Sequence, residues 1–518
     1  MKQTLLSLMV CFCSTVIAQK HDYTWLIGLG GTQTTIPEYG TTRINFNNNP
    51  YQLENIDLDM AFLGSSVSVM SDADGELLFY TNGCYIANAQ GDTIEGGGLL
   101  NYASGVSAKN DCIWGDGYQI VWGAVSVPVT PQTGQYAIIH KDKHSNWAST
   151  YNKVFGHNLY VTRLDMMANN GKGKVTSSEI VLSDTLSYSD ITACKHSNGT
   201  DWWFMVMTTQ TNKFYKFLLQ KDTVLGPYIQ EIGDTLIPGY DICQAIFSPD
   251  GQQYARVNWC NGVMLYDFDR TTGELSNYRN FTYGCAANSD SVKLCGVGFA
   301  PNSRYLYVSG WLKMYQLDTE ADDLQASAKL LGVYDGYLDT VGAAALVPQQ
   351  FYVMANAPDC KIYITAPNQG RVFHMIHEPD LPAPFCDFQQ HAIKIPTYRT
   401  YNIPNFAHYR LGTGNPVCDS SLSIVSAIWH VPKVEIAAHL YPNPSSGHVY
   451  LDVDIGIYRS AIFQVFDLNG RPVFDAAIDN KQLSYNFELK GLPSGLYTYH
   501  LRLPSGQVLF RGRVVIIR

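Results

Sequence analysis

The chain has 518 residues, of which 15% are charged, and its formal net charge is −10. This length exceeds one ordinary hydrophobic core, so we expect several domains or one large closed architecture. Charged residues fall below the usual share of about 25%, while 43 glycines and 34 tyrosines favour strands joined by many turns. The acidic balance and the lack of a basic tract argue against nucleic acid as the main partner.

The first residues have the pattern of an export signal. Lys2 gives a positive start, and the apolar stretch over residues 5–17 is too short to span a bilayer. We therefore predict a signal peptide over residues 1–18. A lipoprotein signal at Cys11 or Cys13 is the alternative, although bulky residues precede Cys11. No later segment has the roughly 18 consecutive apolar residues of a membrane span, so we expect no transmembrane segment in the mature chain.

The body of the chain, residues 19–412, contains a repeated phrase. Each copy has a turn, built on Pro-Asp or Pro-Asn in the clear copies, followed by a strand that opens on a large residue. Proline fixes φ and cannot donate to a sheet, so it belongs in a turn just outside the strand. The clear copies lie about fifty residues apart. The clear copies and then the looser ones are residues 247–254, 299–305, 357–363, 72–80, 130–136 and 198–203.

A second phrase alternates large and polar residues and ends on Asp, over residues 160–165, 264–269 and 313–318. Such alternation before a polar turn indicates a strand entering a hairpin. Repeats of several strands each predict an all-β fold of β-propeller type with about seven blades, and six or eight blades also fit the spacing. The repeats resemble those of tandem-repeat propellers that carry a Ser/Ala-Pro-Asp-Gly turn. A last strand is predicted over residues 403–411.

Ten cysteines remain after the predicted signal. In an exported chain an even number favours disulfides over zinc, and no CxxC pair has metal-finger spacing. We expect a local bridge between Cys285 and Cys295, although spacing alone allows many pairings. The ten are Cys84, Cys112, Cys194, Cys243, Cys260, Cys285, Cys295, Cys360, Cys386 and Cys418.

Residues 413–436 are predicted to be a linker, and residues 437–518 a second, smaller β-domain. Its alternating strands are joined by an Asn-Gly turn and a Pro-Ser-Gly turn, which predicts a small immunoglobulin-like β-sandwich. A plain stalk or a carbohydrate module is the alternative, because sandwiches host many functions. The motif residues, in chain order, are Tyr441, Pro442, Asn443, Pro444, Gly447, Asn469, Gly470, Gly491, Leu492, Gly495 and Tyr497.

Taken in order, these motifs resemble the type A sorting domain of cargo of the Bacteroidetes type IX secretion system. The resemblance implies that residues 437–518 dock on the type IX secretion machinery after the chain has crossed the inner membrane. It also implies that the tail is usually removed, which leaves the body free or attached to the cell surface. We therefore expect a protein that is secreted or bound to the outer-membrane surface, by way of the periplasm.

Catalytic signatures are missing from the sequence, which has no HExxH, GxSxG, P-loop or dinucleotide-binding pattern. We assign no catalytic, cofactor-binding or metal-binding residue. His196 with Asp201, Trp202 and Trp203 could form the rim of a ligand site. Tryptophans that fill the space between sheets are the favoured interpretation, because large aromatic side chains are usually packing groups.

Two further groups have a structural and a metal-binding interpretation. His374, His377, Glu378 and Asp380 could offer metal ligands, but their spacing fits no compelling site and a proline-rich loop is favoured. Residues 72–75 faintly resemble a calcium loop, but they lack the later ligands, so a hairpin turn is favoured.

Five Asp-Thr-apolar tripeptides resemble the short acceptor sequence of Bacteroidetes O-glycosylation. The same pattern describes an ordinary turn before a strand equally well. Glycans at these sites would mark surface loops. The threonines are Thr93, Thr185, Thr223, Thr235 and Thr340.

Two classes of function fit these observations. We prefer a non-catalytic surface or secreted protein whose propeller binds an extracellular protein or glycan. The alternative is an exported hydrolase or lyase with its groups gathered at the central channel. Convergent carboxylates or histidines in the channel would favour the enzyme, whereas a channel plugged by apolar side chains would favour binding. The sequence identifies neither the ligand nor the oligomeric state.

Overall fold

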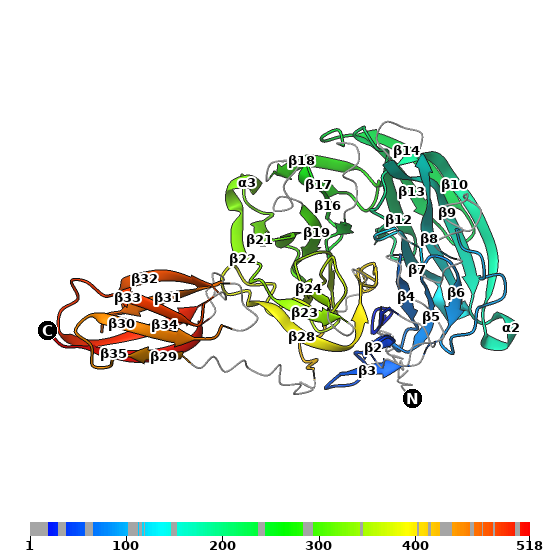
Figure 1. Cartoon of the computed structure of the whole chain (residues 1–518). Coiled ribbons are helices and arrows are strands. Elements are labelled where there is room, and N and C mark those ends of the chain that lie inside the picture. The colour runs from blue at the N-terminus through cyan, green and yellow to red at the C-terminus, as the bar shows by residue number, and fades with distance from the viewer. Residues whose placement is uncertain are drawn as a thin grey trace, which may run out of the picture.

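The computed structural model is almost entirely β-structure (Figure 1). The predicted signal peptide, Cys285 and Asn469 lie outside the residues that it describes. These residues are 19–29, 38–56, 58, 66–101, 112, 117–118, 120–146, 153–236, 244–282, 294–341, 345–400, 403–412, 416–424, 438–455, 460–468, 470–479, 482–502 and 508–518.

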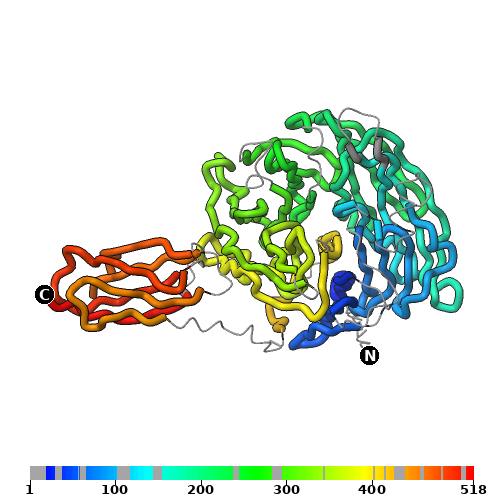
Figure 2. The backbone as a smooth tube through the Cα atoms, in the orientation of Figure 1, coloured from blue at the N-terminus to red at the C-terminus, as the bar shows by residue number. Residues whose placement is uncertain are grey.

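Seven antiparallel sheets of three or four strands follow one another around a ring, as Figures 1 and 2 show. The fold of the body is therefore the predicted β-propeller. Sheet 1 contains β1 (Thr24–Gly28), β2 (Thr41–Asn45) and β3 (Gln52–Ile56), and sheet 2 contains β4 (Ser68–Ser71), β5 (Leu77–Thr81) and β6 (Ile86–Asn88). Sheet 3 contains β7 (Ala124–Thr130), β8 (Gln135–Asn146), β9 (Lys153–Asp165) and β10 (Lys174–Leu186). Sheet 4 contains β11 (Ala193–Lys195), β12 (Trp202–Met207), β13 (Lys213–Leu219) and β14 (Val224–Glu231).

The remaining sheets repeat this four-stranded plan. Sheet 5 contains β15 (Ala245–Phe247), β16 (Gln253–Asn258), β17 (Gly262–Phe268) and β18 (Leu275–Phe281). Sheet 6 contains β19 (Leu294–Phe299), β20 (Tyr305–Gly310), β21 (Lys313–Asp318) and β22 (Lys329–Val333). Sheet 7 contains β25 (Met354–Asn356), β26 (Ile362–Ile364), β27 (Gly370–Ile376) and β28 (Phe388–Arg399). Between sheets 6 and 7 lies the hairpin of β23 (Leu338–Val341) and β24 (Ala345–Pro348), and the short helical turns are η2 (Pro131–Thr133), α2 (Ala168–Gly171) and α3 (Leu324–Ser327).

The repeated Pro-Asp phrase forms the turn between the first and second strands of sheets 5, 6 and 7. In each copy the fourth residue of the turn donates its amide to the carbonyl of the first, three positions earlier. That fourth residue is Gly251, Ser303 or Cys360, with φ of 71°, 66° and 63°. Positive φ is easy for glycine and costs other residues roughly 1 kcal/mol. We call the end of the ring that carries these turns the turn face, and the opposite end the loop face.

Apolar side chains fill the spaces between neighbouring sheets, where the buried clusters lie. The strands nearest the axis are buried along their length, as in β11 and β19. Outer strands such as β10 and β14 are mostly exposed. This gradient is what radial sheets with short, solvent-facing outer edges require.

The predicted last strand over residues 403–411 is wrong. Residues 403–412 form no strand, although Ile403, Ala407 and Tyr409 are buried. The sequence predicted a strand that ends at a glycine- and proline-containing break, but this segment instead turns from the end of β28 into the middle of the ring (Figure 1). We call residues 403–412 the axial segment.

The C-terminal residues form the predicted sandwich. One sheet contains β29 (Ala438–Tyr441), β30 (His448–Val453) and β33 (Ser484–Glu488), and the other contains β32 (Pro472–Asp479), β31 (Ser460–Phe466), β34 (Gly495–Arg502) and β35 (Val508–Ile516). Alternate residues of β30 and β31 are buried in a core of their own, which shares no residue with the cores of the ring. Period-two burial on both sheets is the mark of a sandwich.

Candidate functional site

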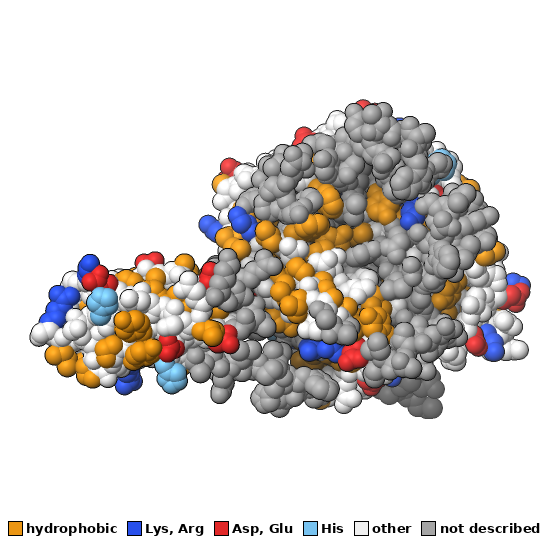
Figure 3. Space-filling model, in the orientation of Figure 1, with side chains coloured by type: hydrophobic (Ala, Val, Ile, Leu, Met, Phe, Trp, Pro, Cys, Tyr) orange, Lys and Arg blue, Asp and Glu red, His pale blue; other side chains and the backbone are white. Residues whose placement is uncertain are grey.

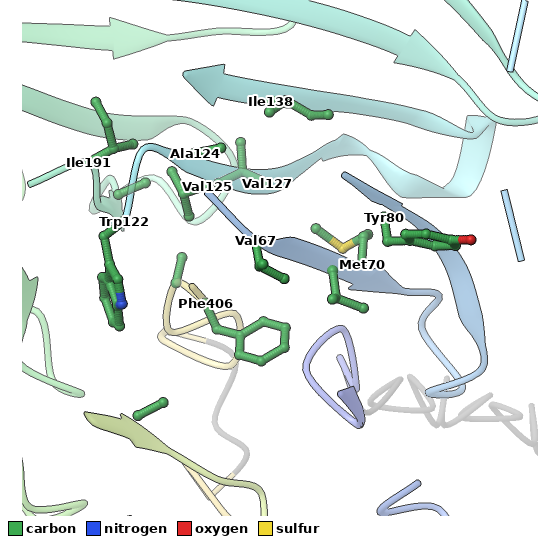
Figure 4. Close-up of a cluster of buried hydrophobic side chains, with 14 of the residues drawn as sticks. Val67, Met70, Tyr80, Trp122, Ala124, Val125, Val127, Ile138, Ile191 and Phe406 are labelled. Atoms are coloured by element: carbon green, nitrogen blue, oxygen red, sulfur yellow. The ribbon is translucent and has the colours of Figure 1, made fainter. Parts of the chain in front are cut away.

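The axial segment occupies the centre of the propeller. At the loop face, the Asn405 side-chain amide donates to the carbonyls of Ala124 (2.9 Å) and Ile191 (2.7 Å). The Asn405 backbone amide donates to the carbonyl of Val67. One residue thereby ties together sheets 2, 3 and 4. Figure 4 shows the neighbouring Phe406 among Val67, Met70 and Trp122, and only 9% of its surface is exposed.

The same segment is anchored at the turn face. The Tyr409 hydroxyl donates to the carbonyl of Ser126, and His408 Nε2 lies 3.1 Å from the carbonyl oxygen of Phe247. Lys195 Nζ donates to the carbonyl of Tyr409, at 2.6 Å, and burial lowers the pKa of Lys195 to about 8. Arg410 makes two hydrogen bonds with the carboxylate of Asp22, at 2.7 and 2.8 Å. The chain therefore passes through the channel from the loop face to the turn face.

Residues 416–424, which belong to the predicted linker, continue this anchorage. Cys418 is bonded to Cys360, in the turn of sheet 7. Tyr51 donates its backbone amide to the carbonyl of Ser423, and Leu422 is buried against the main core. These contacts make the segment part of the propeller.

The loop face carries aromatic side chains around the axis. Trp122 precedes β7, Trp259 follows β16 and Trp311 follows β20; antiparallel pairing brings these positions to the same end of the ring. The rings of Trp259 and Trp311 meet edge to face with centroids 6.1 Å apart, and both side chains are half-buried. Figure 3 shows apolar side chains gathered in the region where β23 and β24 lie in Figure 1. On β24, Leu346 is 63% exposed.

A buried charged cluster supports the loop face from below. Lys141 Nζ donates to Asp190 Oδ1 at 2.6 Å, and Arg256 Nη1 lies 3.2 Å from Asp190 Oδ2. The Ser187 hydroxyl donates to the same carboxylate, and all these side chains are buried. Breaking one partner of such a buried group would cost several kcal/mol, on the order of 3–5. The cluster joins sheets 3, 4 and 5 and fixes the spacing of their loop-face ends.

The predicted rim residues are divided between packing and surface. Trp202 and Trp203 are buried, and their indole N–H groups donate to the carbonyls of Pro128 and Arg270. This geometry agrees with the favoured packing interpretation. His196 and Asp201 lie in the half-buried turn before β12, where the carboxylate of Asp201 accepts from Gln220. No aromatic platform is formed by these residues.

The expected bridge between Cys285 and Cys295 is corrected by the structure. Cys295 is a free, fully buried thiol inside β19, and it donates toward the carbonyls of Ser309 and Phe351. Its side chain is buried in the core and forms no disulfide bond. Disulfides join Cys84 to Cys112 and Cys360 to Cys418, and Cys260 is also disulfide-bonded. Cys194 and Cys386 are free and buried.

The two groups with a metal-binding alternative take structural roles. His374 is buried on β27, and its Nδ1 accepts from the backbone amide of His391. In the part of the chain that the structure describes, no group of three or more His, Cys, Asp or Glu residues could hold a metal ion. Asp72 accepts from the amides of Asp74 and Glu76, so this sequence forms the favoured hairpin turn between β4 and β5.

The five threonines of the Asp-Thr-apolar tripeptides share one environment. All five are exposed, whereas the apolar residue after each is buried or half-buried. Thr319, which follows Asp318 but precedes a glutamate, is buried. The exposure is what both the glycan-acceptor and the turn interpretation require, and the modification itself stays a prediction. The threonines are Thr93, Thr185, Thr223, Thr235 and Thr340.

The sorting motif joins the two ends of the C-terminal domain. Asn443 donates from its side chain to the carbonyl of Arg513 and accepts from the amide of Val515. Ser445, in the same motif, exchanges backbone hydrogen bonds with β35. Gly447, Gly470 and Gly491 have φ of 109°, 75° and 81°, which explains glycine at each position. Of the remaining motif residues, Leu492 and Tyr497 are buried in the core and Tyr441 stacks on Tyr450. Pro442 and Pro444 follow β29, and Gly495 is the first residue of β34.

The comparison with protein families agrees with this geometry. Residues 439–516 match the family described as the secretion system C-terminal sorting domain. The chain is therefore a type IX secretion cargo protein with a propeller body, exported to the medium or to the outer-membrane surface. None of the helices formed by the described residues has the length and apolar character needed to cross a membrane. No curated protein matches the chain.

Solved structures resemble the body only distantly. A candidate 6-phosphogluconolactonase from Bacteroides fragilis is 13% identical, with a TM-score of 0.41 over 75% of this chain and 98% of the other. The periplasmic gluconolactonase of Pseudomonas aeruginosa is 12% identical, with a TM-score of 0.37 over 73% and 99%. The β-propeller domain of Cps50 from Myceliophteria thermophila is 9% identical, with a TM-score of 0.33 over 66% and 95%.

Proposed function

We propose that the protein is an exported binding protein whose propeller presents its loop face to an extracellular protein or glycan. The observation that carries this proposal is the axial segment. A propeller enzyme gathers groups from several blades around the channel, but here Phe406, Ala407 and Tyr409 fill that space. The sorting domain supports the extracellular setting of the ligand.

The half-buried tryptophan pair supplies the chemistry of the loop face. Trp259 and Trp311 combine a large apolar surface with an indole N–H, which suits both sugar rings and protein side chains. The charged cluster of Lys141, Asp190 and Arg256 joins sheets 3, 4 and 5, and sheet 5 carries Trp259. Rigid support of this kind lowers the entropy lost on binding.

Screening of the purified mature protein against arrays of glycans and extracellular proteins tests the proposal. Trp259→Leu and Trp311→Leu should each weaken binding of a hit at least tenfold, as expected for aromatic anchors worth about 2 kcal/mol. Tyr228→Leu, on the exposed outer strand β14, is the matched control and should bind normally. Circular dichroism would confirm that each variant folds.

Two outcomes would contradict the proposal. Equal binding by the tryptophan variants and the control would move the site away from the loop face. Turnover of a sugar lactone or a glycan by the purified protein, lost in a loop-face variant, would replace the binding function with the hydrolase or lyase.

A further inference from the structure

A second cavity lies away from the axis, between sheets 2 and 3. It has a volume of about 160 Å³ and is partly open. The loop that follows β6 forms one wall, with Leu99 and Leu100, and the face of sheet 3 forms the other, with His140, Thr162 and Ser178. We call this cavity the interblade pocket. It shares no residue with the loop-face tryptophans or with the axial segment.

A chain of hydrogen bonds crosses the sheet-3 wall of the pocket. His140 Nδ1 lies 2.7 Å from Asn101 Oδ1, and His140 Nε2 lies 2.8 Å from Thr162 Oγ1. Thr162 Oγ1 lies 2.8 Å from Ser178 Oγ. Burial lowers the pKa of His140 to about 3, so the ring is neutral and carries one N–H.

The direction of proton donation along this chain follows from its first member. Asn101 donates its side-chain N–H to the carbonyl of Gly83, which fixes its Oδ1 as the atom facing His140. Nδ1 of His140 must therefore be the donor, and Nε2 must accept from the Thr162 hydroxyl. Because the Thr162 hydroxyl donates its proton to His140, its oxygen must accept the hydrogen bond from the Ser178 hydroxyl. The chain ends on the Ser178 oxygen, and because Ser178 is exposed, its remaining lone pairs can accept from solvent or from the hydroxyl of a ligand.

The other residues that line the pocket determine which kind of ligand can donate a hydrogen bond to Ser178. Ile86, Leu100 and Val175 give the pocket apolar walls, and no charged side chain lines it. A charged ligand would lose its hydration without a compensating partner, and a purely apolar one would leave the Ser178 oxygen unpaired. The ligand that fits is neutral, with an apolar face and a hydroxyl on its edge.

The volume of the pocket limits the size of the ligand. At about 30 Å³ for each water molecule, 160 Å³ corresponds to only a few waters. That is well below the roughly 300 Å³ at which pockets for drug-sized ligands begin. One sugar ring has this size, an apolar face of C–H groups and hydroxyls around its edge. The half-buried Tyr160, whose ring stacks on that of His140, also lines the pocket.

We propose that the interblade pocket binds one neutral monosaccharide unit, with a sugar hydroxyl donating to the oxygen of Ser178. The unit can be a free sugar or the end of a longer glycan, because the pocket is open on one side. This inference rests on the glycan alternative of the proposed function. It concerns a separate site, so it can be tested independently of ligand binding at the loop face.

Titration of the purified mature protein with single sugars, followed by saturation-transfer NMR, tests the pocket. The panel contains glucose, galactose, mannose and N-acetylglucosamine, with glucuronate and sialic acid as charged counterparts. At least one neutral sugar should bind, and the charged sugars should bind more weakly. Ser178→Ala should weaken binding roughly 2- to 12-fold, the range of one hydrogen bond.

Matched variants keep the test decisive. Ser177→Ala, on the opposite face of β10, should bind as the parent does, and Val175→Phe should fill the pocket and abolish binding. Equal loss in both serine variants, tighter binding of a charged sugar, or no binding of any neutral sugar would overturn the assignment. Trp259→Leu should leave this binding intact, which separates failure at the pocket from failure at the loop face.

Discussion

Histidines with pKa values lowered by burial contribute to the response of the fold to acid. Burial lowers the pKa of His140 and His374 to about 3 and that of His408 to about 4. The unfolded chain takes up protons at these positions as the pH falls below about 6.5, whereas the folded chain does not. Stability conferred by neutral burial is therefore complete above pH 6.5 and is lost as the pH falls toward 3.

Each of these histidines should add a slope of about 1.4 kcal/mol per pH unit to the free energy of unfolding. We predict that His140→Gln lowers the total slope between pH 6 and pH 4.5 by about this amount. Urea unfolding at several pH values measures it. Parallel stability curves for the variant and the parent would show that His140 is protonated without unfolding.

Single residues also mark the limits of what the sequence predicts. The Pro-Asp turns were predictable because their hydrogen bonds are local, three residues apart. The role of Asn405 was not, since its partners Ala124 and Ile191 lie 281 and 214 positions away. The Cys285–Cys295 prediction failed for a related reason: closeness in sequence says nothing about a side chain that points into the core.

Among the elements, the axial segment is held in place by a disulfide bond that follows it in the chain. The bridge from Cys360 to Cys418 closes a loop with a sequence separation of 58 and holds the end of the segment on sheet 7. Removing a bridge of this span should destabilise the body by about 4 kcal/mol on the chain-entropy account.

We predict that Cys360→Ser with Cys418→Ser lowers the melting temperature and lets a protease cut after residue 412 before the rest of the body is digested. Differential scanning calorimetry and limited proteolysis measure the two effects. A Cys84→Ser, Cys112→Ser pair is the control, because its shorter span of 28 should cost less and leave the axial segment protected. Unchanged protection in the first variant would mean that hydrogen bonds alone hold the segment.

At the scale of elements the sequence was informative where alternation was regular. β30 and β31 of the sandwich were predictable from period-two patterns and an Asn-Gly turn. Residues 403–411 were also predicted to be a strand, yet their apolar side chains are buried by a ring of strands and not by a sheet neighbour. The sequence of an apolar segment indicates that its side chains are buried. It does not indicate whether a neighbouring strand or the whole ring of sheets buries them.

The whole molecule consists of a propeller and a sorting domain with separate cores. We predict that deletion of residues 437–518 abolishes export in a host with type IX secretion while leaving the body folded. Fractionation, near-ultraviolet circular dichroism and mass spectrometry of the mature C-terminus measure these effects. Unchanged export of the truncated chain, or retention of residue 518 on the exported protein, would make the tail a binding module.

The axial segment also dictates an order of events during synthesis. A chain leaves the ribosome and crosses the inner membrane from its N-terminus, so all seven sheets emerge before residues 403–412. Until then the axial segment does not occupy the centre of the ring. The carbonyls of Val67, Ala124 and Ile191 lack their hydrogen bonds from Asn405. Final consolidation of the propeller must therefore wait for residues 403–412 and for residues 416–424 after them, which places it just ahead of the arrival of the sorting domain.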